Sequence, residues 1–301
     1  MSRKLDRIFK KSKRITINDN TKIVIMSDCH RGSGNNHDNF IKNEKIFESA
    51  LRYYYINNFT YIELGDGDEM WEVSNYKDII SEHQETFKLL KKFYDNNHLI
   101  MIYGNHDMCK KSKKILEENF YYYYDKVNSQ HKELLNNIIV YESLVLNYKN
   151  KDIFMIHGHQ IDLLNGTLWR LSRFLVRYVW RNLEFIGIND PTLAAKNYSV
   201  SKGIEKRLEK WSIKNNKILI SGHTHRPVFP KVGQSLYFND GSCIHPNGIT
   251  CLEIENGNIT LVKWLFKLEQ DKFISVGKVQ IEKKEAIESF FINLKDANKE
   301  N

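Results

Sequence analysis

Short apolar runs alternate along the chain with polar clusters and with segments of helical periodicity. From residue 22 onward, each of five apolar runs is followed within three residues by a cluster rich in Asp, His and Gly. Because apolar runs bounded by polar turns are typical of buried strands, and helical segments lie between them, we expect stacked β-α units. The expected strands cover residues 23–26, 61–64, 99–103, 153–156 and 218–220, and the expected helices include residues 40–57 and 79–94.

The last part of the chain has a different pattern, which predicts paired strands and a closing helix. Residues 249–254 and 259–266 are strand-like and lie on either side of Asn256-Gly257. Asn-Gly between two such runs is a strong signal for a tight hairpin turn. Residues 283–295 have the pattern of an amphipathic helix.

We divide the chain into one domain at residues 22–282 and two flanking segments. Seven of the first 14 residues are Lys or Arg. We therefore expect residues 1–21 to form a basic N-terminal tail, and we favour a solvated tail over a membrane-surface helix because its apolar face is narrow. Residues 283–301 would be a C-terminal helix and tail. Within the domain, the segment at about residues 110–141 is too long for an ordinary connection and is expected to be an insertion. A second insertion, at about residues 160–214, is expected to be mostly helical and is called here the helical cap.

Composition excludes several classes of protein. With 301 residues, of which 41% are hydrophobic and 27% charged, the chain resembles a folded globular protein rather than a disordered or collagen-like one. No apolar run is long enough for a membrane span or a signal-peptide core. Four cysteines without a C-x-x-C pair indicate free thiols, so we expect a cytoplasmic location. The net charge of +8 favours anionic partners, which include nucleic acid or an anionic membrane surface bound through the basic tail and the cap.

The residues suited to chemistry are concentrated in the polar clusters. Six of the eleven histidines lie in four of these clusters, which random scatter explains poorly. Because ligands of α/β proteins bind beyond the carboxyl ends of strands, we expect the clusters to converge in space. Imidazole together with carboxylate and amide oxygens, and without a thiolate pair, indicates a catalytic rather than a structural metal site. The clusters are Asp28-Cys29-His30, Gly65-Asp66, Gly104-Asn105-His106-Asp107, His157-Gly158-His159 and Gly222-His223-Thr224-His225.

Asp66 is the candidate for a residue shared between two cations. One carboxylate between two metal ions holds them about 3.5 to 4 Å apart, so that the attacking and leaving oxygens of a phosphoryl group are both stabilised. Taken alone, Asp28 or Asp66 could be a helix N-cap, and any one histidine could be a structural hydrogen-bonding residue. The recurrence of the pattern in five clusters favours metal binding.

In this order the clusters resemble the motifs of the calcineurin-like metallophosphoesterases. The family pattern is D-x-H, GD-x-x-D, GNH-[DE], H and GH-x-H, and the chain departs from it at Glu69, where the third Asp is usual. The resemblance covers about residues 22–266. It implies an α/β fold in which a β-sandwich of mixed sheets is flanked by helices, here with the helical cap. It also implies two divalent metal ions, for which Mn²⁺ is our first choice and Fe, Zn or Co are alternatives.

The resemblance further implies a role for each residue of the site. One metal would be held by Asp28, His30, Asp66 and His225, and the other by Asp66, Asn105, His157 and His223. His106 would contact the substrate phosphate or protonate the leaving group, and Asp107 would orient His106.

Within this family, two motifs resemble the UDP-2,3-diacylglucosamine pyrophosphatase branch. They are Gly65-Asp66-x-x-Glu69-x-Trp71 and Gly222-His223-Thr224-His225-Arg226-Pro227. That branch typically has Arg at the position of His106 and Asp at the position of His159. Pyrophosphate chemistry on a nucleotide- or lipid-linked substrate is therefore our leading hypothesis.

Four basic residues are candidates for substrate binding: Arg31, His159, Arg170 and Arg173. The last two belong to a series continued by Arg177 and Arg181, whose spacing of 3, 4 and 4 residues would align the guanidinium groups on one helix face. Such a stripe suits phosphate geometry, and a solvated face of a packed helix is an equally weighted alternative. His159 is either a substrate contact or a residue that orients a metal ligand.

We therefore expect a dinuclear metal-dependent hydrolase that cleaves a phosphodiester or pyrophosphate bond in an anionic phosphoester through a metal-bridging water. A metal-dependent nuclease is one alternative. A non-catalytic metal-binding scaffold or nucleic-acid-binding module is another, supported by the net charge and the arginine series. The sequence allows no inference about a protein partner.

Overall fold

The computed structural model describes residues 2–36, 38–125, 128–162, 198–268 and 274–292. The described helices are α1 (Ser2–Lys11), α2 (Glu44–Ile56), α3 (Tyr76–Glu82), α4 (Gln84–Asp95), α5 (Lys113–Asn119), α8 (Tyr198–Asn215) and α9 (Ser289–Ile292). The described strands are β1 (Lys13–Ile17), β2 (Ile23–Met26), β3 (Thr60–Leu64), β4 (Leu99–Ile102), β5 (Tyr122–Asp125), β6 (Gln130–Glu133), β7 (Val140–Tyr141), β8 (Ser143–Tyr148), β9 (Lys151–Ile156), β10 (Ile218–Ser221), β11 (Tyr237–Asn239), β12 (Ile249–Glu255), β13 (Asn258–Leu268), β14 (Ile274–Gln280) and β15 (Glu285–Ala286). Short 3₁₀ turns cover Met108–Lys111 and His159–Ile161.

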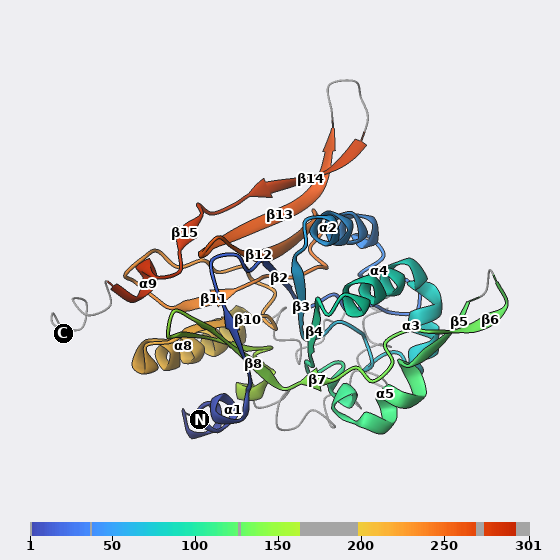
Figure 1. Cartoon of the computed structure of the whole chain (residues 1–301), viewed down its shortest axis with the longest axis horizontal. Helices are drawn as coiled ribbons and strands as arrows, with labels where there is room; N and C mark the ends of the chain where they lie inside the picture. Colours follow the sequence, from blue (N-terminus) through green and yellow to red (C-terminus); the bar gives the residue numbers. More distant parts are fainter. Residues whose placement is uncertain (1, 37, 126–127, 163–197, 269–273, 293–301) are drawn as a thin grey trace.

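Two mixed sheets pack face to face at the centre of the molecule (Figure 1). The smaller sheet has the strand order β1-β8-β9-β10-β11, and the larger has the order β14-β13-β12-β2-β3-β4-β7, with β15 beside β13. Strands β2, β3 and β4 run parallel, as do β9, β10 and β11. The inner faces supply a core of Ile and Leu side chains such as Ile25, Ile62, Leu146 and Ile220. The predicted α/β sandwich of mixed sheets is confirmed, and all five expected strands form.

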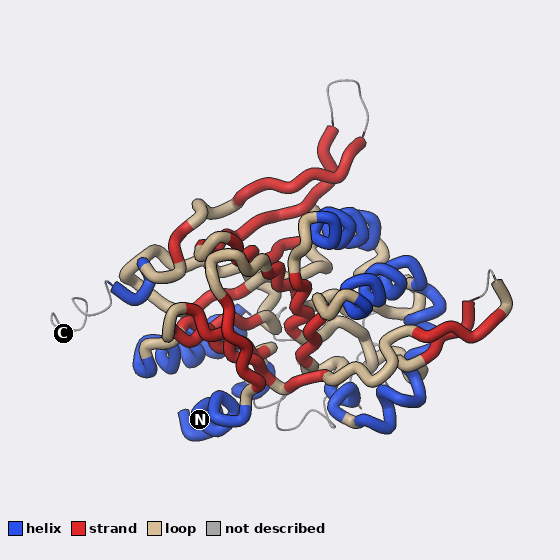
Figure 2. Tube along the Cα trace, in the orientation of Figure 1, coloured by secondary structure: helices blue, strands red, loops and turns tan. Residues whose placement is uncertain are grey.

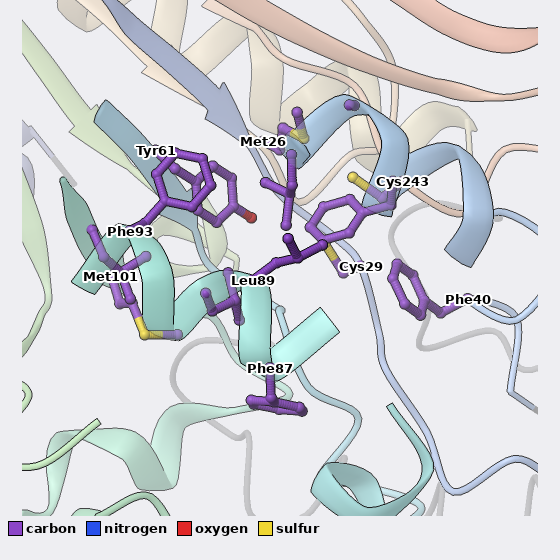
Figure 3. Packing of buried hydrophobic residues seen from close by; sticks show 14 of the residues in the cluster. Met26, Cys29, Phe40, Tyr61, Phe87, Leu89, Phe93, Met101 and Cys243 are labelled. Atoms are coloured by element: carbon purple, nitrogen blue, oxygen red, sulfur yellow. The ribbon is translucent and has the colours of Figure 1, made fainter. Parts of the chain in front are cut away.

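Helices cover the outer face of each sheet, as the blue helices on either side of the red strands show in Figure 2. Helices α2, α3 and α4 pack on the larger sheet, and α1 and α8 pack on the smaller one. Figure 3 shows the first of these layers, where Tyr61 and Met101 of the strands lie near Phe93 of α4, and Met26 and Phe87 belong to the same cluster. Because β2, β3 and β4 are covered on both faces, they are almost entirely apolar, and the polar clusters begin where these strands end.

The helix expected over residues 79–94 is divided at His83, which ends α3 and precedes α4. The buried imidazole lies between two carboxylates: its Nε2 is 2.9 Å from Asp38 and its Nδ1 is 2.7 Å from Glu44. An ionised carboxylate only accepts hydrogen bonds, so both ring nitrogens must carry a proton. Burial lowers the pKa of His83, but the two carboxylates outweigh burial and raise the pKa to about 9.

This arrangement makes part of the stability depend on pH. Because the pKa of His83 in the folded protein lies above its ordinary value of 6.5, the ion pairs stabilise the fold fully below pH 6.5 and progressively less as the pH rises through 9. The contribution to the free energy of unfolding is on the order of 3 kcal/mol. Urea denaturation near pH 6.5 and above pH 9 should show that His83→Gln loses less stability over this range than the wild type. Parallel losses in the two proteins would contradict this account.

The N-terminal segment is not the solvated tail that we expected over residues 1–21. Residues Ser2–Lys11 form α1, whose Leu5 and Ile8 are buried against the smaller sheet. Residues Lys13–Ile17 form β1, the parallel partner of β8 at the edge of that sheet. The prediction of a solvated tail is therefore wrong. The apolar face of this segment is narrow, but it is wide enough to pack a short helix against a sheet.

Other segments refine the expected organisation. The region at about residues 110–141 contains α5, β7 and the β5–β6 hairpin, which projects from the body in Figure 1. In the segment expected to be helical over residues 283–295, β15 precedes α9, because Glu285 and Ala286 pair with β13. Of the helical cap, α8 is described, whereas residues 163–197 lie outside the described residues.

The hairpin predicted from Asn256-Gly257 joins β12 to β13. Both residues have positive φ, +53° and +69°, as a type I′ turn requires. Among the helices of the described ranges, none combines the length and the apolar character needed to cross a membrane.

Candidate metal centre

The polar clusters converge where parallel strands of the two sheets end. Residues 28 and 30 follow β2, residue 66 follows β3, residue 105 follows β4, residue 157 follows β9, and residues 223 and 225 follow β10. Among the described residues, three groups of three side chains have ligand atoms within 4.8 Å of one another; one of them, His30 with Glu69 and His106, shares His30 with the first of the two groups formed by the predicted ligands. The first group is Asp28, His30 and His225, and the second is Asp66, His157 and His223.

The carboxylate of Asp66 lies between the two groups. Its Oδ2 is 3.0 Å from Nε2 of His157 and 3.8 Å from Nε2 of His30. In the first group, Oδ1 of Asp28 is 3.0 Å from Nε2 of His225. Oδ2 of Asp66 therefore lies near an imidazole of each group, as a ligand shared by two cations would. Oδ1 of Asp28 also lies 3.8 Å from Nε2 of His157 in the second group.

Several of the predicted ligand atoms are buried and have no hydrogen-bond partner. These atoms are Asp28 Oδ1, His30 Nε2, Asn105 Oδ1 and His157 Nε2. Buried polar atoms without a partner are rare in native proteins, and ions placed among these atoms would satisfy them together. The other ring nitrogen of His157 is already engaged, because Nδ1 lies 2.9 Å from the carbonyl oxygen of Leu64. Imidazole nitrogen with carboxylate and amide oxygen fits divalent ions such as Mn²⁺, Fe²⁺, Co²⁺ or Zn²⁺.

The backbone turns sharply at the ligand residues. Five of them have a positive φ: Asp28 (+52°), His30 (+49°), Asp66 (+51°), His223 (+67°) and His225 (+55°). This conformation is uncommon outside glycine and clusters at functional sites. Backbone hydrogen bonds connect the turns that follow β2 and β3. The N–H of Asp28 donates to the carbonyl oxygen of Gly65 at 3.0 Å, and the N–H of His30 donates to the carbonyl oxygen of Asp66 at 2.9 Å. A Cβ at Gly104 would lie 2.0 Å from Oδ1 of Asp66, so glycine is required for this close approach.

The site holds its carboxylates in the ionised form. Burial raises the pKa of Asp66, but the imidazoles of His157, His106 and His30 outweigh burial and hold the pKa far below its usual range. Burial lowers the pKa of His157, but the carboxylates of Asp66 and Asp28 raise it to about 9. A metal ion that bound at Nε2 of His157 would take the place of a proton there.

Glu69 orients His106, the residue expected to act on the substrate. Its two carboxylate oxygens lie 2.8 Å from Nδ1 of His106 and 2.8 Å from Nδ1 of His30. The ring of Trp71 stacks on His106 with a centroid distance of 4.2 Å and an interplanar angle of 20°. His106 is thereby fixed beside a metal ligand, with Nε2 as the ring nitrogen left to face a substrate.

Asp107 does not orient His106, and this prediction is wrong. The Asp107 carboxylate accepts hydrogen bonds from the backbone N–H of Gly104 at 2.7 Å and of Gly67 at 3.1 Å, and it pairs with Lys110 at 2.7 Å. It thus connects the two turns that carry Asp66 and His106. Adjacency in the sequence suggested a direct contact, whereas the turn directs the two side chains to different partners.

The prediction that Arg31 binds substrate is also wrong. Its side chain has no exposed surface and forms a two-pronged pair with Glu63 at 2.8 and 3.0 Å. Its Nε donates to Asp68 at 2.7 Å. A guanidinium with these partners in the interior has no free face for a substrate.

The other predicted substrate-binding residues have different outcomes. His159 is buried, with 3% of its surface exposed, and its ring centroid lies 5.5 Å from that of His157. His106 is almost equally buried, with 6% of its surface exposed, so burial does not distinguish the two predicted roles of His159, and both stay predictions. Arg170 and Arg173, with the rest of the arginine series, lie outside the described residues.

Sequence reasoning missed Asp162, which lies just after the second 3₁₀ turn. Its Oδ2 is 3.1 Å from Nε2 of His223. A ligating histidine commonly donates its other ring N–H to a carboxylate, which fixes the tautomer and the ring orientation. Nδ1 of His223 is therefore the nitrogen available to a metal. An Asp three residues after His159 carries no signal by itself, because the contact depends on how two distant loops meet.

Comparison with known proteins places these observations in context. Residues 21–227 match the family model described as calcineurin-like phosphoesterase. A conserved uncharacterized protein from Streptococcus pneumoniae TIGR4, described as a predicted phosphoesterase, has a solved structure that is similar at 15% identity with a TM-score of 0.33, covering 86% of this chain and 97% of that one. Vps29 of Chaetomium thermophilum is similar at 8% identity with a TM-score of 0.39, covering 89% of this chain and 98% of that one. The search of curated proteins found no match.

Proposed function

The chain belongs to the calcineurin-like phosphoesterase family, and on that premise we propose that it hydrolyses a phosphodiester or pyrophosphate bond with two divalent metal ions. The observation that carries the proposal is the place of the Asp66 carboxylate, within reach of His30 in one group and His157 in the other. Two cations that share one carboxylate suit phosphoryl transfer, because the attacking and leaving oxygens each gain a positive partner.

The residues of the chain would divide the work between holding the ions and acting on the substrate. When bound, the ions would supply Lewis acidity and activate water for attack on phosphorus. His106 has its Nδ1 on Glu69, so its Nε2 can stabilise charge on the phosphoryl oxygens or protonate the leaving group. Trp71 limits rotation of that ring by stacking on it.

For the substrate we favour a nucleotide- or lipid-linked pyrophosphate, with Mn²⁺ as the metal. The support is the resemblance of the motifs at residues 65–71 and 222–227 to the UDP-2,3-diacylglucosamine pyrophosphatase branch. The contacts of Glu69 and Trp71 with His106 are particular to this chain, because that branch typically has Arg at the position of His106. All four cysteines are free thiols, which agrees with the proposed cytoplasmic location.

A panel of phosphoesters tests the proposal directly. Protein loaded with Mn²⁺ would be incubated with bis(p-nitrophenyl) phosphate, a nucleotide-diphosphate-linked compound and a labelled oligonucleotide, and product release would be measured. We expect turnover of the first two. Cleavage of the oligonucleotide alone would favour a nuclease. Full metal loading without turnover of any phosphoester would overturn the enzymatic proposal.

Replacing His106 with alanine should separate catalysis from metal binding. We expect kcat to fall by roughly 10²- to 10⁴-fold, the usual contribution of a positioned acid or base. Metal content, measured by inductively coupled plasma mass spectrometry, should stay at the wild-type level. His131→Ala is a matched control, because His131 lies on the β5–β6 hairpin and should leave kcat unchanged. Equal loss of metal and activity in His106→Ala would contradict this role.

A further inference from the structure

Asp240 is a fully buried carboxyl group that the proposed mechanism does not use. It follows β11 directly and has no exposed surface. Its Oδ1 lies 2.8 Å from the hydroxyl of Ser27, and its Oδ2 is buried without a hydrogen-bond partner. Within the described residues, no Lys, Arg or His forms an ion pair with it. A carboxyl group in such a place needs a physical reason, because an isolated buried charge is costly.

Ser27 connects Asp240 to the first group of metal ligands. Its hydroxyl oxygen is 2.5 Å from Oδ2 of Asp28, and the same Oδ2 accepts the backbone N–H of His223 at 2.9 Å. Both contacts hold one oxygen of Asp28. The other oxygen, Oδ1, has no hydrogen-bond partner and faces His225 at 3.0 Å. The contacts on Oδ2 therefore fix the direction in which Oδ1 can meet a metal ion.

The number of protons shared by Asp28, Ser27 and Asp240 defines the protonation state of Asp240. Ser27 has one hydroxyl proton and two carboxyl oxygens within hydrogen-bond distance, 2.5 Å on Asp28 and 2.8 Å on Asp240. Ionised carboxylates can only accept. If the hydroxyl proton goes to Asp28, the contact with Asp240 requires a proton on Asp240. Burial and the nearby charge of Asp28 both raise the pKa of Asp240, in agreement with the count.

We propose that Asp240 is a positioning residue of the metal centre, which as a neutral carboxylic acid donates to Ser27 and thereby holds Asp28 in place for a metal ion. This inference rests on the metal centre of the proposed function and is independent of the substrate. It predicts that a neutral donor of the same shape can replace Asp240. An apolar side chain of similar size cannot, because the hydroxyl of Ser27 then loses its donor.

The test is calorimetric titration of Mn²⁺ into the metal-free full chain and four variants. Partners that orient a metal ligand typically contribute roughly 10- to 100-fold in metal affinity. We expect a loss of this size for Asp240→Leu and Ser27→Ala. Asp240→Asn, whose amide can donate to Ser27, should stay within about threefold of the wild type. The double variant Ser27→Ala/Asp240→Leu should be no weaker than Ser27→Ala, because the two residues act in series.

Two controls keep the result interpretable. Thermal unfolding of each variant shows whether it is folded, and if Asp240→Leu does not fold, the comparison of Asp240→Asn with Ser27→Ala decides. Asp125→Asn, a buried carboxylate paired with Lys132 on the hairpin, should leave Mn²⁺ affinity unchanged. Wild-type affinity in Ser27→Ala, or a loss in Asp240→Asn as large as that in Ser27→Ala, would overturn the inference. Normal Mn²⁺ binding without hydrolysis would overturn only the proposed function, and absence of Mn²⁺ binding in the wild type would overturn both.

Discussion

Asp66→Asn should bind neither metal ion tightly and should lose nearly all phosphoesterase activity. The Asp66 carboxylate lies 3.0 Å from His157 in one group and 3.8 Å from His30 in the other, so neutralising it should weaken both metal positions at once. The loss of affinity should exceed the roughly 10- to 100-fold effect expected for a residue that only orients a ligand. In the wild type, Oδ1 of Asp66 accepts a hydrogen bond from the backbone N–H of His106 at 2.8 Å. The amide oxygen of asparagine can accept the same hydrogen bond, so the turn should persist in the variant.

Mass spectrometry of metal content and calorimetric titration of Mn²⁺ measure this effect. Asp162→Asn is an informative comparison, because Asp162 contacts His223, a ligand of the second group. It should weaken one of two binding events, whereas Asp66→Asn should weaken both. Two equivalents of tightly bound Mn²⁺ in Asp66→Asn would disprove a shared carboxylate.

Lys110→Met should destabilise the fold strongly, because it removes a buried cation that several carboxylates share. The side chain of Lys110 is 1% exposed, and its ammonium group lies 2.7 Å from the carboxylate of Asp68 and 2.7 Å from that of Asp107. Without it, Asp68 and Glu63 keep Arg31 as a buried cation, whereas Asp107 loses the cation with which it pairs. Removing one partner of a buried ion pair costs about 3–5 kcal/mol, because the other charge stays buried.

Urea denaturation and thermal unfolding would measure this cost, and we expect Tm to fall by roughly 10 °C. Lys113→Met is the matched control, since Lys113 is 80% exposed and pairs with Glu117 at 3.5 Å. An exposed pair contributes about 0–1 kcal/mol. Equal unfolding free energies for the two variants would show that the buried network does not stabilise the fold.

The strands and the convergence of the site could be predicted because their signals are local. An apolar run that is followed by a polar cluster, such as residues 23–26, predicts both the position of a strand and the residue at which it ends. Parallel neighbours then bring the ends of β2, β3 and β4 to one edge. The meeting of the candidate ligands at this edge needed no further information, and their binding of metal ions stays a prediction.

The partners of the site residues could not be predicted, because each depends on the meeting of distant segments. Asp107 stands next to His106 in the chain, yet Glu69 provides the contact. Arg31 had the charge for a phosphate, but Glu63 and Asp68 enclose it. The composition of the basic N-terminal segment predicted a tail, but part of the segment forms β1, which pairs with β8 at the edge of a sheet. Composition describes what a side chain can do, and the neighbours supplied by other strands decide what it does.

The ligands of the centre are spread over residues 28 to 225 and belong to both sheets. A nascent chain on the ribosome therefore lacks a complete centre until β10 and the loop after it have emerged and the halves of the sandwich have docked. If the proposed function holds, tight binding of two ions would report the last stage of folding rather than the first. Cutting the chain between β4 and β9 would leave two fragments, neither of which carries all the candidate ligands.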